Sequence, residues 1–136
     1  MSELFFAGDH MLEGICEGGE HAAPCGGVVV AHPHPLYGGT MAQPVVYRVA
    51  KACRERGLAT LRFNFRGVGR SQGAFDHGAG ELSDAAAALD WVQAVHPDAR
   101  SCWVAGFSFG AWIGMQLLMR RPEIEGFMSV APPANL

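Results

Sequence analysis

The sequence predicts an α/β fold with a mostly parallel sheet that is covered by helices on both faces. Apolar runs rich in β-branched and aromatic residues, typical of buried strands, alternate with segments of helical periodicity. Such an alternation requires helical crossovers, and these connect parallel strands. The chain has 136 residues, of which 49% are hydrophobic, so it can bury a core. We expect one domain over residues 1–136.

An antiparallel hairpin and a buried strand are predicted first. The hairpin covers residues 3–16 and turns at Gly8–Asp9. Residues 28–32, Val-Val-Val-Ala-His, are typical of a strand buried on both faces. A helix is predicted from about Ala42 to Gly57, because one of its faces is apolar and consists of Val45, Val46, Val49, Ala50 and Cys53.

Two further strands and a second helix are predicted. Residues 58–65 are predicted as a strand that leads into a glycine-rich loop, and residues 124–131 as the last strand. The helix between them covers residues 81–95 and ends before Pro97. Its apolar stripe consists of Leu82, Ala85, Ala86, Leu89 and Val92. We expect the three tryptophans to pack in the core or between helices and sheet; they are Trp91, Trp103 and Trp112.

Composition excludes several functional classes. Ten Lys and Arg residues against 13 Asp and Glu give a net charge of −3 without a basic run, so no nucleic-acid partner is indicated. The first residues resemble neither a signal peptide nor a membrane span, so we expect no membrane partner and a cytoplasmic location. The four cysteines form no C-x-x-C pair, which argues against a zinc or redox site. We expect reduced structural thiols, with Cys53 and Cys102 buried.

Residues 106–110, Gly-Phe-Ser-Phe-Gly, match the G-x-S-x-G pattern of a nucleophile elbow. In a chain with 18 glycines the pattern alone can arise by chance, so the segments on either side of it decide whether it is a nucleophile elbow. An apolar strand-like run from residue 101 precedes it, and an apolar helix-like run to residue 119 follows. Ser108 is therefore the candidate nucleophile. Gly106 and Gly110 are expected where strand and helix close on each other and no side chain fits.

The carboxyl ends of the predicted strands carry further polar residues, and ligands bind at this edge of such sheets. His32 and His34 form an H-x-H pair, but two ligands without a clear third are weak evidence for a metal. We expect no metal and a structural role for His32. Arg66 is expected to form a buried ion pair with Asp84 or Asp76, which ties its loop to the next helix. The alternative for Arg66 is binding of an acidic substrate.

Four ordered motifs, at residues 32–41, 62–73, 75–84 and 106–111, resemble those of bacterial α/β-hydrolases close to dienelactone hydrolase, which are lidless, esterase-like serine hydrolases. The resemblance implies an α/β-hydrolase fold and hydrolysis of a small-molecule, ester-like substrate without a cofactor.

The same resemblance assigns roles at the site. It implies that Ser108 is the nucleophile and that the N–H of Phe109 is one oxyanion donor. The second donor should come from the loop after the first parallel strand. Two residues of that loop are prolines without an N–H, which leaves His34 or Leu36. His34 is favoured because the loop resembles the H-G-x-P loop of related hydrolases. We also expect Phe107 or Phe109 to line an apolar acyl pocket.

The chain departs from the family in its triad. The family order is serine, acid, histidine, yet no histidine follows Ser108, and the only acids after it are Glu123 and Glu125. We therefore expect the N-terminal part of a hydrolase, lacking the C-terminal strands and inactive by itself. The alternative is a noncatalytic scaffold that keeps the elbow and associates through strand 124–131 at an open sheet edge.

Overall fold

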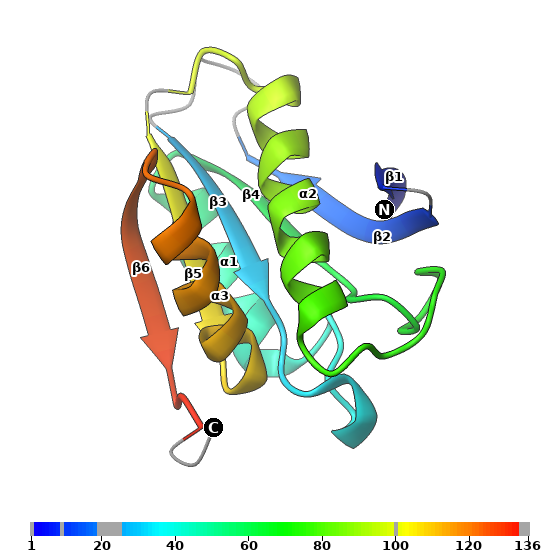
Figure 1. The fold of residues 1–136 in the computed structure, drawn as a ribbon. Helices are drawn as coiled ribbons and strands as arrows, with labels where there is room; N and C mark the ends of the chain where they lie inside the picture. The colour runs from blue at the N-terminus through cyan, green and yellow to red at the C-terminus, as the bar shows by residue number, and fades with distance from the viewer. Residues whose placement is uncertain (1, 9, 19–25, 100, 134–136) are drawn as a thin grey trace.

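A computed structural model describes residues 2–8, 10–18, 26–99 and 101–133 (Figure 1). In chain order the elements are β1 (Glu3–Ala7), β2 (His10–Glu17), β3 (Gly26–Ala31), the 3-10 helix η1 (Pro35–Tyr37), α1 (Pro44–Glu55), β4 (Leu58–Phe63), α2 (Ala79–Val95), β5 (Cys102–Phe107), α3 (Phe109–Arg120) and β6 (Ile124–Val130). The six strands form one sheet in the order β1-β2-β4-β3-β5-β6.

The sheet is parallel except at its hairpin edge. β4, β3, β5 and β6 run parallel, whereas β2 pairs antiparallel with both β1 and β4. Val29 of the central strand β3 is in register with Leu61 of β4 and with Val104 of β5. All three side chains are buried. The predicted α/β fold and its N-terminal hairpin are thus confirmed.

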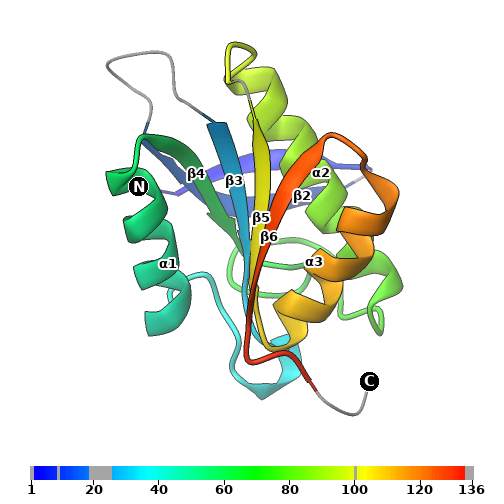
Figure 2. The same ribbon diagram turned by 90° about the vertical axis from the view of Figure 1, so that its left-hand side faces the viewer.

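Helices cover both faces of the sheet, α1 on one side and α2 with α3 on the other (Figure 2). Alternate residues of β3 explain why this strand is apolar throughout. Val28 and Val30 belong to the core cluster beneath α1, whereas Val29 and Ala31 belong to the larger cluster beneath α2 and α3. A strand that faces a core on both sides has no solvent-exposed face for polar residues.

Local capping sets the helix ends. α1 begins at Pro44 rather than Ala42, because the Gln43 side chain caps it by accepting hydrogen bonds from Val45 N (2.7 Å) and Val46 N (3.1 Å). α2 begins two residues before the predicted start. β4 ends at Phe63 rather than at residue 65. Asn64 N still donates to Glu13 O of β2, but Phe65 N donates to the ring of His32 and not to a strand.

The expectations for the cysteines and for the last strand are met in part. Cys53 is buried, but Cys102 is only partly buried at the start of β5, and Cys25 lies outside the described residues. β6 pairs with β5 alone within the described sheet, and most of its residues are partly or largely exposed. No helix among the described residues has the length and apolar character needed to cross a membrane.

Candidate active site

Ser108 occupies the turn between β5 and α3 with a left-handed backbone, φ +58° and ψ −115°. This conformation is uncommon for a residue with a side chain. A Cβ atom on Gly106 would overlap the Gly110 carbonyl, and one on Gly110 would overlap the carbonyl oxygen of Ala31 at the end of β3. Both neighbours are backbone atoms, so no side-chain movement relieves the overlap. Strand, helix and β3 therefore meet here only because both positions are glycine.

Backbone hydrogen bonds fix this turn. Ser108 N donates to Val130 O at the end of β6 (2.9 Å), and Ser108 O accepts from Ala111 N and Trp112 N in the first turn of α3. Phe109 is the first residue of α3, so its N–H has no acceptor within the helix. Among the described residues no other acceptor bonds to it. The Phe109 N–H at the positive end of α3 thus remains available to a ligand.

His32 lies in the loop after β3 and is fully buried. Phe65 N donates to its Nε2 (3.0 Å), so the ring proton is on Nδ1, which donates to Pro33 O (2.6 Å). Burial lowers the pKa of His32 to about 4, although the bond to Pro33 opposes this shift. With both ring nitrogens engaged, His32 holds the loop and has no lone pair for a metal.

His34 follows two residues later with its ring among aromatic side chains. Its ring centroid lies 4.6 Å from that of Tyr37, 4.9 Å from Phe75 and 4.8 Å from Phe109. Leu36 N donates to His34 Nδ1 (3.2 Å), so the Leu36 N–H, the alternative oxyanion donor, is already engaged. Among the described residues the His34 N–H has no acceptor. The structure therefore brings the rings of His34 and Phe109 together.

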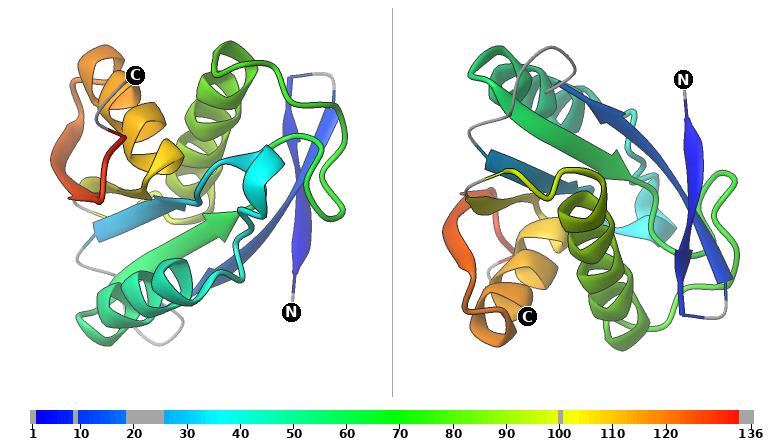
Figure 3. Two further views of the ribbon diagram at one scale, coloured as in Figure 1. Left: turned by 90° about the horizontal axis from the view of Figure 1, so that it is seen from below. Right: turned by 90° about the horizontal axis from the view of Figure 1, so that it is seen from above.

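A pocket of about 370 Å³ opens beside Phe109. Six ring-bearing residues line it, namely His34, Tyr37, Phe75, His77, Phe109 and Trp112, together with Leu36. Trp112 was expected to pack in the core or between helices and sheet; it is half-buried, packs against the core cluster and also lines this pocket. The spacing of Phe109 and Trp112 by three residues, on one face of α3, was a signal for this arrangement. Figure 3, left, looks onto the strand ends where η1 and the start of α3 lie.

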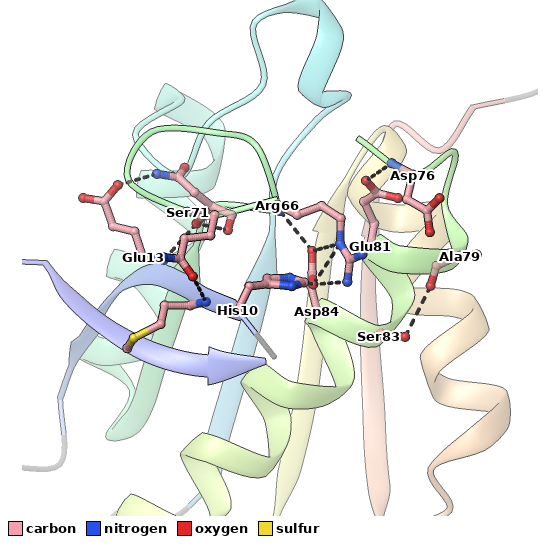
Figure 4. Close-up of polar contacts among 12 residues, drawn as sticks. His10, Glu13, Arg66, Ser71, Asp76, Ala79, Glu81, Ser83 and Asp84 are labelled. Carbon is pink, nitrogen blue, oxygen red and sulfur yellow. Dashed lines mark hydrogen bonds and ion pairs between the residues drawn. The ribbon is translucent and has the colours of Figure 1, made fainter. Parts of the chain in front are cut away.

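Arg66 and Asp84 form a buried ion pair (Figure 4). Arg66 NH2 lies 2.8 Å from Asp84 Oδ1, and Nε and the backbone N–H of Arg66 also donate to this carboxylate. Hydrogen bonds to Asp84 raise the pKa of Arg66 above its usual range despite its partial burial. Because the guanidinium is already bound to Asp84, the pair ties the loop after β4 to α2. Asp76, the alternative partner, is exposed.

Two further buried carboxylates, missed by the sequence analysis, hold the loop after β4. Glu81 is fully buried and accepts from Asp76 N (2.8 Å) and Gly78 N (2.7 Å). Glu13 on β2 accepts from Arg70 N (2.9 Å) and from Asn64 Nδ2 (3.0 Å). Figure 4 shows Glu13, Arg66, Glu81 and Asp84 along this loop. Nothing in the local sequence marked Glu13, because its partners lie more than 50 positions away.

The acids that follow Ser108 lie away from it. Glu123 precedes β6 and pairs with Arg121 at 2.7 Å, while Ser108 follows the opposite, carboxyl end of the neighbouring strand β5. Glu125 is an exposed residue near the start of β6. Neither residue is in position to orient a catalytic base beside Ser108.

Comparisons with known proteins agree with this fold. The family model described as X-Pro dipeptidyl-peptidase (S15 family) matches residues 20–136. An uncharacterized protein of Rickettsia prowazekii, RP471, is 51% identical over 138 residues, which cover 99% of this chain and 57% of that protein.

Solved structures are similar over the whole chain. An α/β-hydrolase of unknown function from Agrobacterium tumefaciens superposes with a TM-score of 0.94 at 59% identity, over 99% of this chain and 62% of that one. A lidless α/β serine hydrolase from Xanthomonas campestris gives 0.88 at 38% identity, over 98% and 62%. The chain thus spans about three-fifths of the length of these relatives. The chain belongs to the X-Pro dipeptidyl-peptidase (S15) family, among the α/β serine hydrolases.

Proposed function

We propose that this chain carries the nucleophile and the oxyanion donors of a serine hydrolase acting on carboxylic esters. Ser108 Oγ attacks the ester carbonyl carbon, and the electron pair of the C=O bond moves onto oxygen. The N–H groups of Phe109 and His34 donate to that oxyanion. Collapse of the intermediate expels the alcohol, which takes up the proton lost from Ser108, and water then hydrolyses the acyl-enzyme.

The left-handed backbone of Ser108 carries this proposal. Holding a residue with a side chain in such a conformation costs on the order of 1–3 kcal/mol. Glycine adopts it with little strain, so a purely structural turn is better served by glycine. A serine at this position is explained by the use of its hydroxyl group. The residue is partly exposed between β5 and α3.

The triad order of related hydrolases places the histidine that accepts the serine proton after the nucleophile. No histidine follows Ser108 in the 136 residues. His34 is a poor substitute, because its Nδ1 accepts from Leu36 N and its proton is therefore on Nε2. Because a serine hydroxyl without a base is a weak nucleophile, we propose that the 136 residues alone turn over esters no faster than a Ser108→Ala variant.

The test supplies an external base. The purified chain is incubated with p-nitrophenyl acetate, with and without imidazole, and acetylation of Ser108 is measured by peptide mass spectrometry. We expect acetyl-Ser108 only with imidazole. The Ser83→Ala variant is a matched control, because Ser83 is an exposed serine on α2, and it should behave as the unaltered chain. Absence of acetyl-Ser108 under all conditions contradicts the proposed nucleophile.

Turnover without imidazole tests the second part of the proposal. If hydrolysis in plain buffer depends on Ser108, a base lies within these 136 residues and the proposed inactivity is wrong. The ester chemistry itself, as opposed to peptide-bond hydrolysis, is tested by offering p-nitrophenyl acetate and an X-Pro p-nitroanilide side by side under the imidazole conditions.

Self-association through β6 is a second candidate property. Its support is that β6 pairs on one side only within the described sheet, where Phe127 and Met128 are partly exposed. Sedimentation of the chain at several concentrations tests it. A discrete dimer that Met128→Glu dissociates supports pairing through β6, and a concentration-independent monomer contradicts it.

A further inference from the structure

Building on the proposed hydrolase, we propose that the pocket lined by His34 and Phe109 binds an uncharged aromatic ring of the ester substrate. The pocket borders the nucleophile turn, because Phe109 directly follows Ser108. Its lining includes His34 and Phe109, whose ring centroids are 4.8 Å apart and whose N–H groups are the proposed oxyanion donors. The two residues that carry the proposed donors thus also line the pocket, which makes it the proposed place for a group next to the reacting carbonyl.

The rings of the pocket are arranged for stacking. His34 contacts the rings of Tyr37, Phe75 and Phe109, Phe75 also contacts His77 (5.0 Å), and Phe109 contacts Trp112 (5.7 Å). Most pairs are tilted, and centroid distances of 4.5–7 Å are those at which aromatic rings attract one another. A flat aromatic ring entering the pocket extends this array, whereas a saturated ring gains only apolar burial.

The lining also determines the charge of the ligand. None of the seven lining residues is Asp, Glu, Lys or Arg. His34 Nδ1 accepts from Leu36 N, so this nitrogen has no proton to offer an anion. A charged group placed here would lose hydration without gaining an ionic partner from the lining. The pocket likewise offers no carboxylate to the ammonium group of a peptide N-terminus. An uncharged ring is therefore the ligand that this surface favours.

Exposed apolar side chains at the rim support a binding role over simple packing. Tyr37 is 83% exposed and Leu36 is 62% exposed, both on η1. A ring cluster that served only the core would bury these side chains. A bound ligand removes part of their apolar surface from water, which contributes to its affinity.

The opposite wall of the pocket is fixed before any ligand binds. Glu81 accepts from the backbone of Asp76 and Gly78, on both sides of His77 and directly after Phe75. His77 has a left-handed backbone, φ +54°, which these two bonds hold in place. A rigid wall lowers the entropic cost of binding. We infer that Glu81 is a positioning residue for Phe75 and His77.

Binding without turnover tests the pocket separately from the chemistry. The Ser108→Ala variant is titrated with four probes in ligand-observed NMR. Methyl phenylacetate places the ring on the acyl side, benzyl acetate places it on the alcohol side, methyl cyclohexylacetate is the saturated match, and phenylacetate is the anion. We expect one of the aromatic esters to bind about 2- to 10-fold more tightly than the saturated ester. Which ester does so identifies the side of the substrate that carries the ring.

The only two tyrosines of the chain provide a matched pair of variants. Tyr37 lines the pocket, whereas Tyr47 lies on α1 against Arg62, and both are exposed, so neither substitution threatens folding. Tyr37→Leu should reduce the aromatic preference, and Tyr47→Leu should leave it unchanged. Phe75→Leu should reduce it further, and Glu81→Gln should weaken binding of the preferred ester.

Three results would overturn the aromatic pocket: equal binding of the saturated and both aromatic esters, tighter binding of the phenylacetate anion, or a preference that Tyr37→Leu and Phe75→Leu leave unchanged. These outcomes are separable from failure of the hydrolase. If Ser108 is never acylated, the proposed reaction is wrong but the binding preference can still be present. If the binding preference is absent, acylation of Ser108 can still be observed.

Discussion

The loops that follow β3 and β4 lie at the carboxyl ends of these parallel strands but are held in place in different ways. The β4 loop, residues 64–78, is held from outside by buried carboxylates on β2 and α2 that accept from its backbone. The β3 loop, residues 32–39, is held mainly by its own two histidines. It also exposes two of its apolar side chains to solvent.

The two kinds of side chain have different expected roles, one in the stability of the fold and the other in binding a ligand. Buried charged groups with every bond made give a loop one conformation, and removing any of them is costly. Exposed apolar groups contribute little to the free energy of unfolding but offer surface to a ligand. The buried polar groups that hold these loops are therefore expected to govern stability, and the exposed apolar side chains of the β3 loop to contribute to binding alone. Four predictions test this division.

The largest effect is expected for Asp84→Ala. It removes the acceptor of the Arg66 side chain and backbone N–H and leaves a guanidinium that is only 16% exposed without its partner. We expect a loss of about 3–5 kcal/mol in the free energy of unfolding, measured by urea denaturation. Asp90→Ala is the matched control on the same helix, because Asp90 is 64% exposed and pairs with Arg121 at the surface. It should cost about 0–1 kcal/mol, and equal losses for both variants would contradict the prediction.

The second prediction concerns pH, through His32, which connects the two loops. Its pKa falls from 6.5 in the unfolded chain to about 4 in the folded one, so between these values the unfolded state binds more protons. Stability should therefore be complete above pH 6.5 and decline as pH falls toward 4, by about 3 kcal/mol from this group. Urea denaturation of the protein and of His32→Gln at pH 7, 5.5 and 4.5 isolates the contribution. An unchanged pH dependence in the variant would refute it.

Glu81→Gln should have the next largest effect. The amide provides one acceptor oxygen where the carboxylate provides two, so one of the Asp76 and Gly78 N–H groups loses its partner. We expect a loss of about 1–3 kcal/mol in thermal or urea unfolding. Glu55→Gln, at an exposed position near the end of α1, is the control and should change stability by less than about 0.5 kcal/mol. If the free energies of unfolding of the Glu81→Gln and Glu55→Gln variants differ by less than about 0.5 kcal/mol, Glu81 does not hold the β4 loop as inferred.

The smallest effect on stability is expected for Tyr37→Leu in the β3 loop. Its side chain is 83% exposed, so the free energy of unfolding should change by less than about 0.5 kcal/mol. The same variant should reduce the preference for aromatic esters, as proposed above. A destabilisation as large as that of Glu81→Gln would show that the exposed side chains of the β3 loop also support the fold, and their assignment to binding alone would then be wrong.

Local patterns predicted the parts of the site that are continuous in sequence. Residues 106–110 indicated the turn at Ser108 because its strand, glycines and helix are adjacent. Pro33 and Pro35, which have no N–H, limited the candidates for the second oxyanion donor to His34 and Leu36. In the structure the Leu36 N–H donates to the His34 ring. Of the pocket only Phe109 was predicted, as an alternative to Phe107, because the rings come from three separate segments. Trp112 packs against the core as expected and also lines the pocket, which the sequence did not indicate.

The sequence by itself determined the order of strands and helices and the position of the nucleophile elbow, because hydrophobic periodicity and glycine requirements are local properties. Only the tertiary structure decided that Arg66 pairs with Asp84 rather than Asp76, that Glu13 and Glu81 hold the β4 loop, and that His34, Phe75 and Phe109 share one pocket. These contacts join residues on different elements. Their partners are selected by which strand ends the sheet brings side by side, and no local pattern records that choice.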